Sequence, residues 1–410
     1  MIAVATRGTP NRCLTRTVLG RVTTRELVSG IREDHVLVVA EDLPDACRAA
    51  GYVGTITNHT VAGPISASWP GPLVHSAARL DHLQDGDVVS LDATGYVRTL
   101  YRIASRHNAI FATDRCNSYC LMCSQPPREL DDRDRVAEHF RLIELMDPAT
   151  AELGITGGEP TLLKDDFIEL VRRCKERMPN TALHVLSNGR LFYYGRFARK
   201  LAEVNHPDLM IGIPLYSDID AEHDYVVQCR GAFDDTVIGL QNLGRFGVPV
   251  EIRTVTHRLT APRLSALSEF VYRNLPFASH VTFMGLEMMG FAIPNVSKLW
   301  IDPWDYREEL ERAVLHLSSR GMRVSVYNHQ LCTLPVSLWP YSRASISDWK
   351  NEYLPRCGTC MVRDECGGFF LSSVERGRVS VHIEPFVEDP RATTGGRRNH
   401  PQGPATPEEA

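Results

Sequence analysis

Three cysteines, Cys116, Cys120 and Cys123, lie close together with three and then two residues between them. Thiolates at this spacing can converge on one iron–sulfur cluster, because each needs to reach only a few ångström to an iron. Three ligands on a four-iron cluster leave one iron open, and an open position is what a metal centre needs to bind a reactant. Taken alone, such a loop also fits buried thiols or part of a zinc site.

A second short motif follows the cysteine loop by about one strand-helix unit. This run is Gly157-Gly158-Glu159-Pro160. Together and in this order, the two motifs resemble the cluster loop and the methionine-binding motif of the radical S-adenosylmethionine (SAM) enzymes. The resemblance implies a 4Fe–4S cluster whose open iron chelates the amino and carboxylate groups of SAM. It also implies reductive cleavage of SAM to a 5′-deoxyadenosyl radical that abstracts hydrogen from a substrate.

The residue types of the second motif suit that role. Gly157 and Gly158 have no side chain, so the backbone can approach the methionine group closely. Glu159 offers a carboxylate to its ammonium group. Pro160 fixes the turn that leaves the strand.

Four more residues are candidates for contact with SAM. Ser187 and Asn188 match the place where relatives contact the ribose hydroxyls, although a plain strand-to-helix turn explains them nearly as well. Arg253 could bind the cofactor carboxylate with its planar fork, or form a salt bridge at the end of the sheet. Met122 could pack against the adenine. No catalytic residue beyond the cluster is assigned.

A narrower resemblance covers residues 106–375. It rests on the runs from Met122 to Pro127, from Ser345 to Lys350 and from Cys366 to Phe370, which are similar to the radical maturases of the His-Xaa-Ser peptide system, of the type lettered C. This implies a ribosomally made peptide substrate with His-Xaa-Ser repeats. It also implies a partner radical SAM maturase and an external electron donor such as flavodoxin or ferredoxin.

A second set of cysteines lies near the C-terminus: Cys332, Cys357, Cys360 and Cys366. Four cysteines can saturate a metal site. The set resembles the auxiliary-cluster extension of peptide-modifying radical enzymes, which implies a second 4Fe–4S cluster. Tetrahedral zinc is the alternative.

The middle of the chain alternates apolar runs typical of strands with helical stripes. The strands are expected at 109–112, 153–156, 182–186, 209–215, 250–255 and 281–286; the stripes include Val136, Phe140 and Ile143, then Phe167, Val171 and Cys174, then Leu310, Val314 and Leu317. Six such units predict an α/β fold, a partial (β/α)6 TIM-like barrel over residues 106–325. Both motifs then fall at the C-terminal ends of its strands, where ligands bind.

Other parts of the chain flank this core. Residues 1–105 read as a β-rich module with one or two helices, which could dock a substrate or partner along an edge strand. Asp85-Gly86-Asp87 and Ala93-Thr94-Gly95 are typical of hairpin turns. Residues 326–389 form the Cys-rich auxiliary metal-binding region, and 390–410 are expected to be a disordered tail.

Composition narrows the class of protein. The 410 residues are 43% apolar and carry a formal charge of −5, which gives no electrostatic reason to expect nucleic-acid binding. Apolar runs stay well short of the roughly 18 residues of a membrane span, so we expect a cytoplasmic protein without membrane association. A radical enzyme acting on a small metabolite or RNA, or a non-enzymatic iron–sulfur or zinc scaffold, are the alternatives to a peptide-modifying enzyme.

Overall fold

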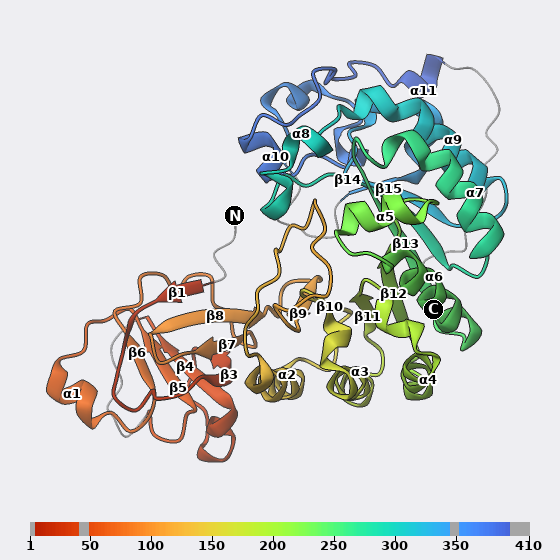
Figure 1. The fold of residues 1–410 in the computed structure, drawn as a ribbon. Coiled ribbons are helices and arrows are strands. Elements are labelled where there is room, and N and C mark those ends of the chain that lie inside the picture. The colour runs from red at the N-terminus through yellow and green to blue at the C-terminus, as the bar shows by residue number, and fades with distance from the viewer. Residues whose placement is uncertain (1–4, 41–48, 345–351, 394–410) are drawn as a thin grey trace.

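Two eight-stranded sheets, one in each lobe, organise the chain (Figure 1). The computed structural model describes residues 5–40, 49–344 and 352–393. The run from Ser345 to Lys350, one basis of the narrower resemblance, therefore lies outside the described residues.

The N-terminal lobe is a mixed sheet that closes on itself. Its strands, in spatial order, are β1 (Ala5–Arg7), β8 (Tyr96–Tyr101), β7 (Val88–Leu91), β3 (Val18–Thr23), β4 (His35–Val39), β5 (Gly54–Thr57), β6 (Leu73–His75) and β2 (Thr9–Pro10), with η1 (Ser29–Asp34) and α1 (Gly63–Ser68) between strands. Only Gly8 separates β1, which pairs with β8, from β2, which pairs with β6. One segment therefore joins both ends of the sheet, and no long free edge remains among the described strands for the docking expected there.

One of the two expected hairpin turns is confirmed. β7 and β8 pair antiparallel across the turn that contains Ala93-Thr94-Gly95. The hairpin expected at Asp85-Gly86-Asp87 is wrong, because β6 and β7 are not neighbours in the sheet. That turn leads the chain into β7 beside β3 instead.

The second sheet is parallel throughout and follows the order of the chain. Its strands are β9 (Asn108–Phe111), β10 (Glu152–Thr156), β11 (Ala182–Leu186), β12 (Leu209–Pro214), β13 (Val250–Thr256), β14 (His280–Gly285), β15 (Val324–Tyr327) and β16 (Ser342–Arg343). This confirms the α/β partial barrel and all six expected strands. The expected end of the core at residue 325 is wrong, because β15 and β16 extend the same sheet.

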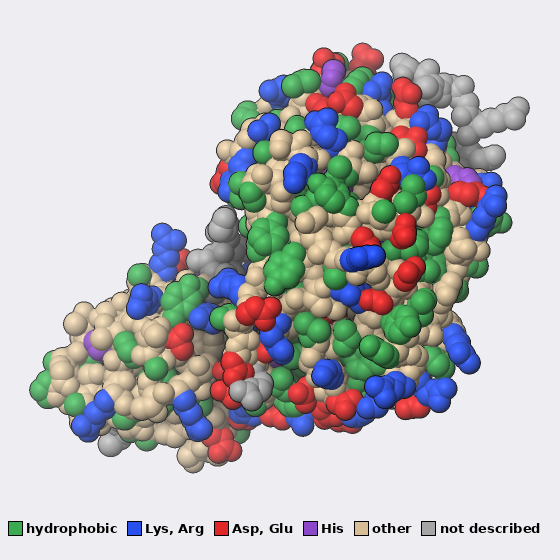
Figure 2. Space-filling model, in the orientation of Figure 1, with side chains coloured by type: hydrophobic (Ala, Val, Ile, Leu, Met, Phe, Trp, Pro, Cys, Tyr) green, Lys and Arg blue, Asp and Glu red, His purple; other side chains and the backbone are tan. Residues whose placement is uncertain are grey.

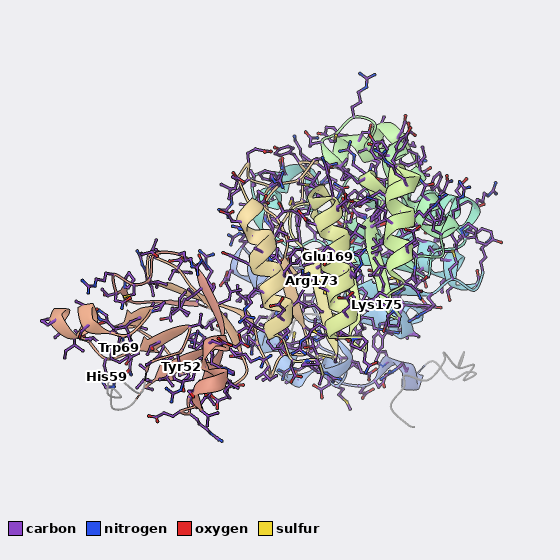
Figure 3. All side chains as sticks on the ribbon, turned by 90° about the horizontal axis from the view of Figure 1, so that it is seen from below. Tyr52, His59, Trp69, Glu169, Arg173 and Lys175 are labelled. Carbon is purple, nitrogen blue, oxygen red and sulfur yellow. The ribbon has the colours of Figure 1, made fainter. Side chains whose placement is uncertain are left out.

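Amphipathic helices cover the outside of this sheet. They are α2 (Arg133–Leu145), α3 (Asp165–Arg177), α4 (Gly195–Val204), α6 (Ala232–Arg245), α7 (Leu264–Asn274) and α9 (Arg307–Ser318). The three expected stripes lie on α2, α3 and α9, and Cys174 is confirmed as core. Figure 3 labels three residues of α3: Arg173 pairs with Glu169 one turn before it, and Lys175 Nζ donates to the Val204 carbonyl of α4 at 2.8 Å.

Alternation along the strands gives the barrel an apolar outside and a polar inside. On β13, Val250 and Ile252 are fully buried in the core shared with the helices. Glu251 and Arg253 alternate with them and so face the interior.

Short elements complete the larger lobe. They are α5 (Asp220–Val227), α8 (Val296–Leu299), α10 (Leu371–Glu375) and α11 (Pro390–Thr393), with the 3-10 turns η2 (Pro160–Leu163), η3 (Arg190–Tyr193), η4 (Ala261–Arg263), η5 (Gly290–Ala292), η6 (Pro303–Tyr306), η7 (Leu331–Thr333), η8 (Val336–Tyr341), η9 (Pro355–Thr359) and η10 (Arg363–Glu365). The disordered tail expected from residue 390 is not disordered at its start, because Arg391 of α11 pairs with Glu365 and Asp389. Residues 394–410 lie outside the described residues.

The lobes meet through α2 and the end of β8. Arg21 of β3 donates to the Leu145 carbonyl at 2.7 Å, and Tyr101 of β8 bonds Thr150 at 3.0 Å. Acidic and basic side chains are interspersed over the face in Figure 2. Among the described helices, none has the length and apolar character needed to cross a membrane.

Candidate functional site

The two sequence motifs are joined by backbone hydrogen bonds beyond the end of the sheet. Gly158 N donates to the Thr113 carbonyl at 2.7 Å, and Glu159 N donates to the Arg115 carbonyl at 2.8 Å. A Cβ atom at Gly157 would lie 2.6 Å from the Thr113 oxygen, and one at Gly158 would overlap the Arg115 oxygen. The glycines are therefore needed for contact with the segment that leads into the cysteine loop, a reason different from the expected approach to methionine.

The cysteine loop is held from both sides by backbone contacts. Tyr119 N and Leu121 N donate to the Val227 and Val226 carbonyls at the end of α5, at 3.0 and 2.9 Å. On the other side, Phe291 N donates to the Cys123 carbonyl at 2.8 Å. These contacts position the loop independently of any metal.

The three thiols share one half-buried environment. Burial raises the pKa of Cys116 to about 12, and the negative charge of Glu159 adds to the rise. Burial likewise raises the pKa of Cys120, helped by the charges of Cys123 and Cys116. The charges of Cys116 and Cys123 act on Cys120, so the three thiols lie near enough to interact, and metal binding would release their protons. Among the described residues, no group of three His, Cys, Asp or Glu side chains is placed to hold a single metal ion.

Glu159 is fully buried, and its carboxylate is occupied by the chain. It accepts hydrogen bonds from Thr161 N at 3.0 Å, Thr161 Oγ1 at 2.5 Å, Ser187 Oγ at 2.8 Å and Asn188 N at 2.6 Å. Pro160, as expected, starts the turn out of β10. The carboxylate thus ties the ends of β10 and β11 together, and its expected contact with an ammonium group stays a prediction that would require these bonds to rearrange.

Ser187 and Asn188 turn toward the protein. The Ser187 hydroxyl donates to Glu159 and accepts from Gly189 N at 3.0 Å, so it serves the turn. Asn188 reaches the cysteine loop: its Nδ2 donates to Asn117 Oδ1 at 2.6 Å and lies 3.9 Å from Cys116 Sγ. Contact of either residue with ribose stays a prediction.

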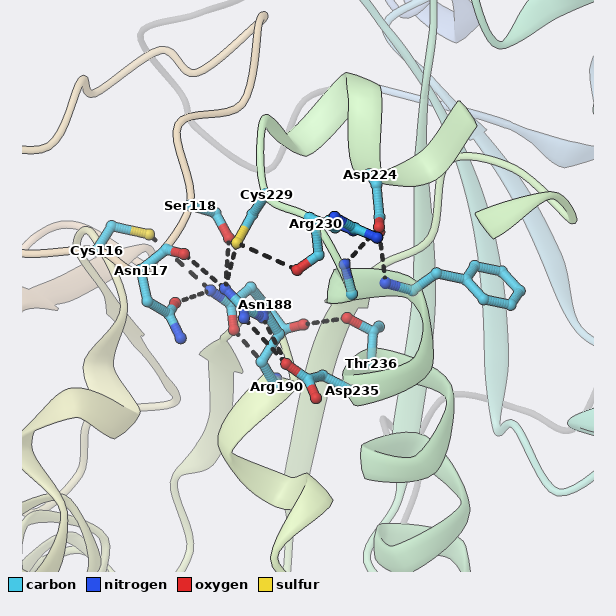
Figure 4. A network of polar contacts seen from close by, with 12 residues as sticks. Cys116, Asn117, Ser118, Asn188, Arg190, Asp224, Cys229, Arg230, Asp235 and Thr236 are labelled. Atoms are coloured by element: carbon cyan, nitrogen blue, oxygen red, sulfur yellow. Dashed lines mark hydrogen bonds and ion pairs between the residues drawn. The ribbon is translucent and has the colours of Figure 1, made fainter. Parts of the chain in front are cut away.

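Arg190 is a site residue that the sequence did not single out. Its guanidinium donates to the Asn117 carbonyl at 2.6 Å, to Cys229 Sγ at 3.2 Å and to Asp235 of α6 at 2.9 Å (Figure 4). Cys229, a free thiol, belongs with Cys120 to one apolar cluster. The Ser187-Asn188-Gly189-Arg190 turn was the available signal, but nothing in it indicates the three distant partners.

Comparison with known proteins identifies this part of the chain. Residues 110–263 match the model of the radical SAM superfamily. Over these residues the chain is similar to radical SAM domains. No curated protein matches the sequence significantly. The radical SAM superfamily implies an enzyme that binds a 4Fe–4S cluster and SAM. Binding of the cluster by the three cysteines, and of SAM by the glycine pair, stays a prediction.

Solved structures of low sequence identity share part of this fold. Streptococcus suis SuiB bound to S-adenosylmethionine is 16% identical over 59% of this chain and 53% of that chain, with a TM-score of 0.42. Native anSMEcpe with bound AdoMet and Cp18Cys peptide is 17% identical over 53% of this chain and 62% of that one, with a TM-score of 0.40. A radical SAM methyltransferase from Sphaerobacter thermophilus is 15% identical over 60% of this chain and 74% of that one, also with a TM-score of 0.40. The chain spans about half the length of SuiB.

Inside the barrel of the larger lobe, Arg253 belongs to a polar cluster. Its Nη1 donates to Glu251 Oε2 at 2.6 Å, and its Nη2 lies 3.1 Å from Met284 Sδ. Glu251 also meets His184 at 3.0 Å and His280 at 3.4 Å. Burial opposes ionisation of Glu251, but the hydrogen bonds of both histidines and the charge of Arg253 outweigh it and lower the pKa of this carboxyl. The salt bridge allowed for Arg253 is therefore present, and its contact with SAM stays a prediction.

Met122 packs in the apolar cluster beside the cysteine loop. It is 6% exposed and shares that cluster with Tyr216 and Met288. The cluster packs against one side of the loop, at Cys120. Packing of Met122 against adenine stays a prediction.

The four C-terminal cysteines line one pocket. Cys332 lies on η7, Cys357 on η9, and Cys360 and Cys366 in the turns that follow. Burial raises the pKa of Cys332 to about 11, and the charges of Cys366 and Cys357 add to it. The backbone amide of Gly368 donates toward the Cys366 sulfur. The pocket brings together four thiols from η7, from η9 and its end, and from the end of η10.

Proposed function

We propose that this protein is a radical SAM enzyme that modifies a ribosomally made peptide. The observation that carries the proposal is the backbone pairing of 157–159 with 113–115, which fixes the glycine motif beside the cysteine loop at the C-terminal ends of β9 and β10. Ligands of parallel α/β sheets bind at this edge. When bound by Cys116, Cys120 and Cys123, a 4Fe–4S cluster supplies the electron for reductive cleavage of SAM.

The chain's own residues prepare this site in three ways. Arg190 and Asn188 hold the loop at Asn117, next to the first ligand. Glu159 fixes the ends of two strands against each other. The apolar cluster around Met122 packs against the loop at Cys120 and so supports its position.

The peptide substrate is supported by the sequence resemblance to the His-Xaa-Ser maturases around the cysteine loop and Cys366. The gathering of Cys332, Cys357, Cys360 and Cys366 in one pocket supports a second metal site of the kind that accompanies peptide modification. We propose a second 4Fe–4S cluster there, with zinc as the alternative. A partner maturase and a flavodoxin-like or ferredoxin-like electron donor belong to the same proposal, as does docking through the N-terminal lobe by contacts other than an edge strand.

The proposal is tested by release of 5′-deoxyadenosine from SAM. The anaerobically reconstituted protein is incubated with dithionite, with and without a peptide carrying His-Xaa-Ser repeats, and both small molecule and peptide are analysed by mass spectrometry. We expect cleavage by wild type and by a Cys13→Ala control, none by the triple alanine variant of the cysteine loop, and a SAM-dependent mass change of the peptide. Cleavage by the triple variant would contradict the cluster assignment, and an unchanged peptide would contradict the substrate.

A further inference from the structure

A second pocket lies where the barrel meets the C-terminal region. Thr256 and Gly285, at the ends of β13 and β14, form its floor with Asn328, which follows β15. Trp300 after α8 and Phe370 and Ser373 around α10 form other walls. Figure 1 places α8 and α10 together beside β14. The pocket is therefore at the carboxyl edge of the sheet, the edge at which the barrel carries the two sequence motifs.

Two polar side chains of this pocket have no hydrogen-bond partner among the described residues. Asn328 is 8% exposed and its Nδ2 is unpaired; Ser373 is 6% exposed and its Oγ is unpaired. A buried donor without an acceptor costs about 1 to 3 kcal/mol, so native structures rarely keep one without a use. Both groups can donate. An occupant of the pocket should therefore bring acceptors.

The charge of the pocket lining also favours an occupant that brings hydrogen-bond acceptors. Arg378 lies in the lining, is exposed, and forms no ion pair with any described residue, whereas no Asp or Glu lines the pocket. The adjacent Asp302 has both carboxylate oxygens on backbone amides, those of Trp304 at 3.0 Å and Val381 at 3.1 Å. The lining thus combines one cation and two unused donors with the apolar surfaces of Trp300 and Phe370.

The pocket lined by the four C-terminal cysteines shares part of these walls. Gln330 and Phe369 line both this pocket and the one that gathers the four C-terminal cysteines. Gln330 is fixed, because its Nε2 donates to the Gly368 carbonyl at 2.7 Å. A chain segment bound here would lie between the barrel and the second cysteine set.

We propose that this pocket binds a carboxylate-bearing residue of the peptide substrate, with the Asn328 amide and Ser373 hydroxyl donating to the carboxylate and Arg378 supplying the opposite charge. The inference rests on the proposed function, because it assigns a subsite to that same substrate. It adds a preference for an acidic residue next to an apolar one, which the walls of the pocket would bury.

Two short probes test this on the full-length, anaerobically reconstituted protein: acetyl-Leu-Glu-amide and acetyl-Leu-Gln-amide, measured by saturation-transfer difference NMR titration. We expect the glutamate probe to bind about tenfold more tightly than the glutamine probe, the ratio of one charge-assisted hydrogen bond. Asn328→Asp and Arg378→Gln should each abolish most of that preference. Asn205→Asp is the matched control, because Asn205 also has a left-handed backbone (φ 52° against 59° at Asn328) but lies at the end of α4.

Equal binding of the two probes, or an undiminished preference in both variants, would overturn the assignment. Arg378 is exposed, so its variant reports on binding even if Asn328→Asp fails to fold. The assay needs neither a reductant nor SAM. Loss of SAM cleavage with the preference intact would therefore count against the proposed function alone, and normal cleavage without any preference would count against the pocket alone.

Discussion

At the scale of single residues, the site depends on side chains that connect separate segments. Arg190 joins the cysteine loop, the loop at Cys229 and α6. Glu159 joins the ends of β10 and β11. Sequence alone identified Glu159 through its motif but missed Arg190, because an arginine one residue after a glycine turn carries no sign of its partners elsewhere in the chain.

Replacing Arg190 by Gln should loosen the cysteine loop. The variant loses charge-assisted hydrogen bonds to Asn117 and Asp235, and we expect the free energy of unfolding to fall by about 2 kcal/mol. Urea denaturation of the metal-free protein measures this, and the iron retained after desalting of reconstituted protein should fall in parallel. Arg172→Gln is the control, since Arg172 only pairs with Glu169 on the surface of α3. Equal effects of the two substitutions would refute a special role for Arg190.

At the scale of elements, strands and helices with long apolar patterns could be predicted from the sequence, and short ones could not. All six expected strands and three stripes are present, whereas β15 and the two-residue β16 were missed. A run such as β15 is stabilised by its neighbour β14 more than by its own pattern. The structural need for glycine at 157 and 158 could not be predicted either, because it depends on contact with backbone more than forty residues away in the sequence.

Gly158→Ala should therefore damage the site without touching a ligand. Its Cβ would overlap the Arg115 carbonyl, so the backbone pairing of the two motifs must open. We expect a loss of stability of about 1 to 3 kcal/mol, in the range of overpacking, and loss of most cluster iron after reconstitution. Gly30→Ala, where a Cβ meets nothing within 4 Å, should leave both unchanged. Normal iron content in Gly158→Ala would mean that the pairing does not position the loop.

At the scale of the whole molecule, the chain forms two lobes with different sheets: a closed mixed sheet in the N-terminal lobe and a parallel partial barrel in the larger lobe. The composition predicted a β-rich N-terminal module but not its closure, because β1 and β2 are too short to be recognised.

The larger lobe buries several histidines. Burial lowers the pKa of His223 to about 4, of His257 to about 3 and of His329 to about 4.

These histidines predict a loss of stability in mild acid. The unfolded chain binds protons near pH 6.5 and the folded chain does not, so stability is full above that pH and falls as the pH drops toward the folded pKa values. At pH 5 each histidine should cost about 2 kcal/mol relative to pH 7. Urea denaturation of wild type and His257→Gln at both pH values measures this. The variant should lose about 2 kcal/mol less than wild type between pH 7 and pH 5. An identical pH dependence of the two proteins would contradict the prediction.

The central claim, that two separate cysteine sets each hold a cluster, is tested most directly by iron and acid-labile sulfide in anaerobically reconstituted protein. Wild type is compared with the triple alanine variant of Cys116, Cys120 and Cys123. We predict about eight irons per chain in wild type and about four in the variant. About four falling to none, with zinc retained, would make the C-terminal site structural. No loss of iron in the variant would contradict the account as a whole.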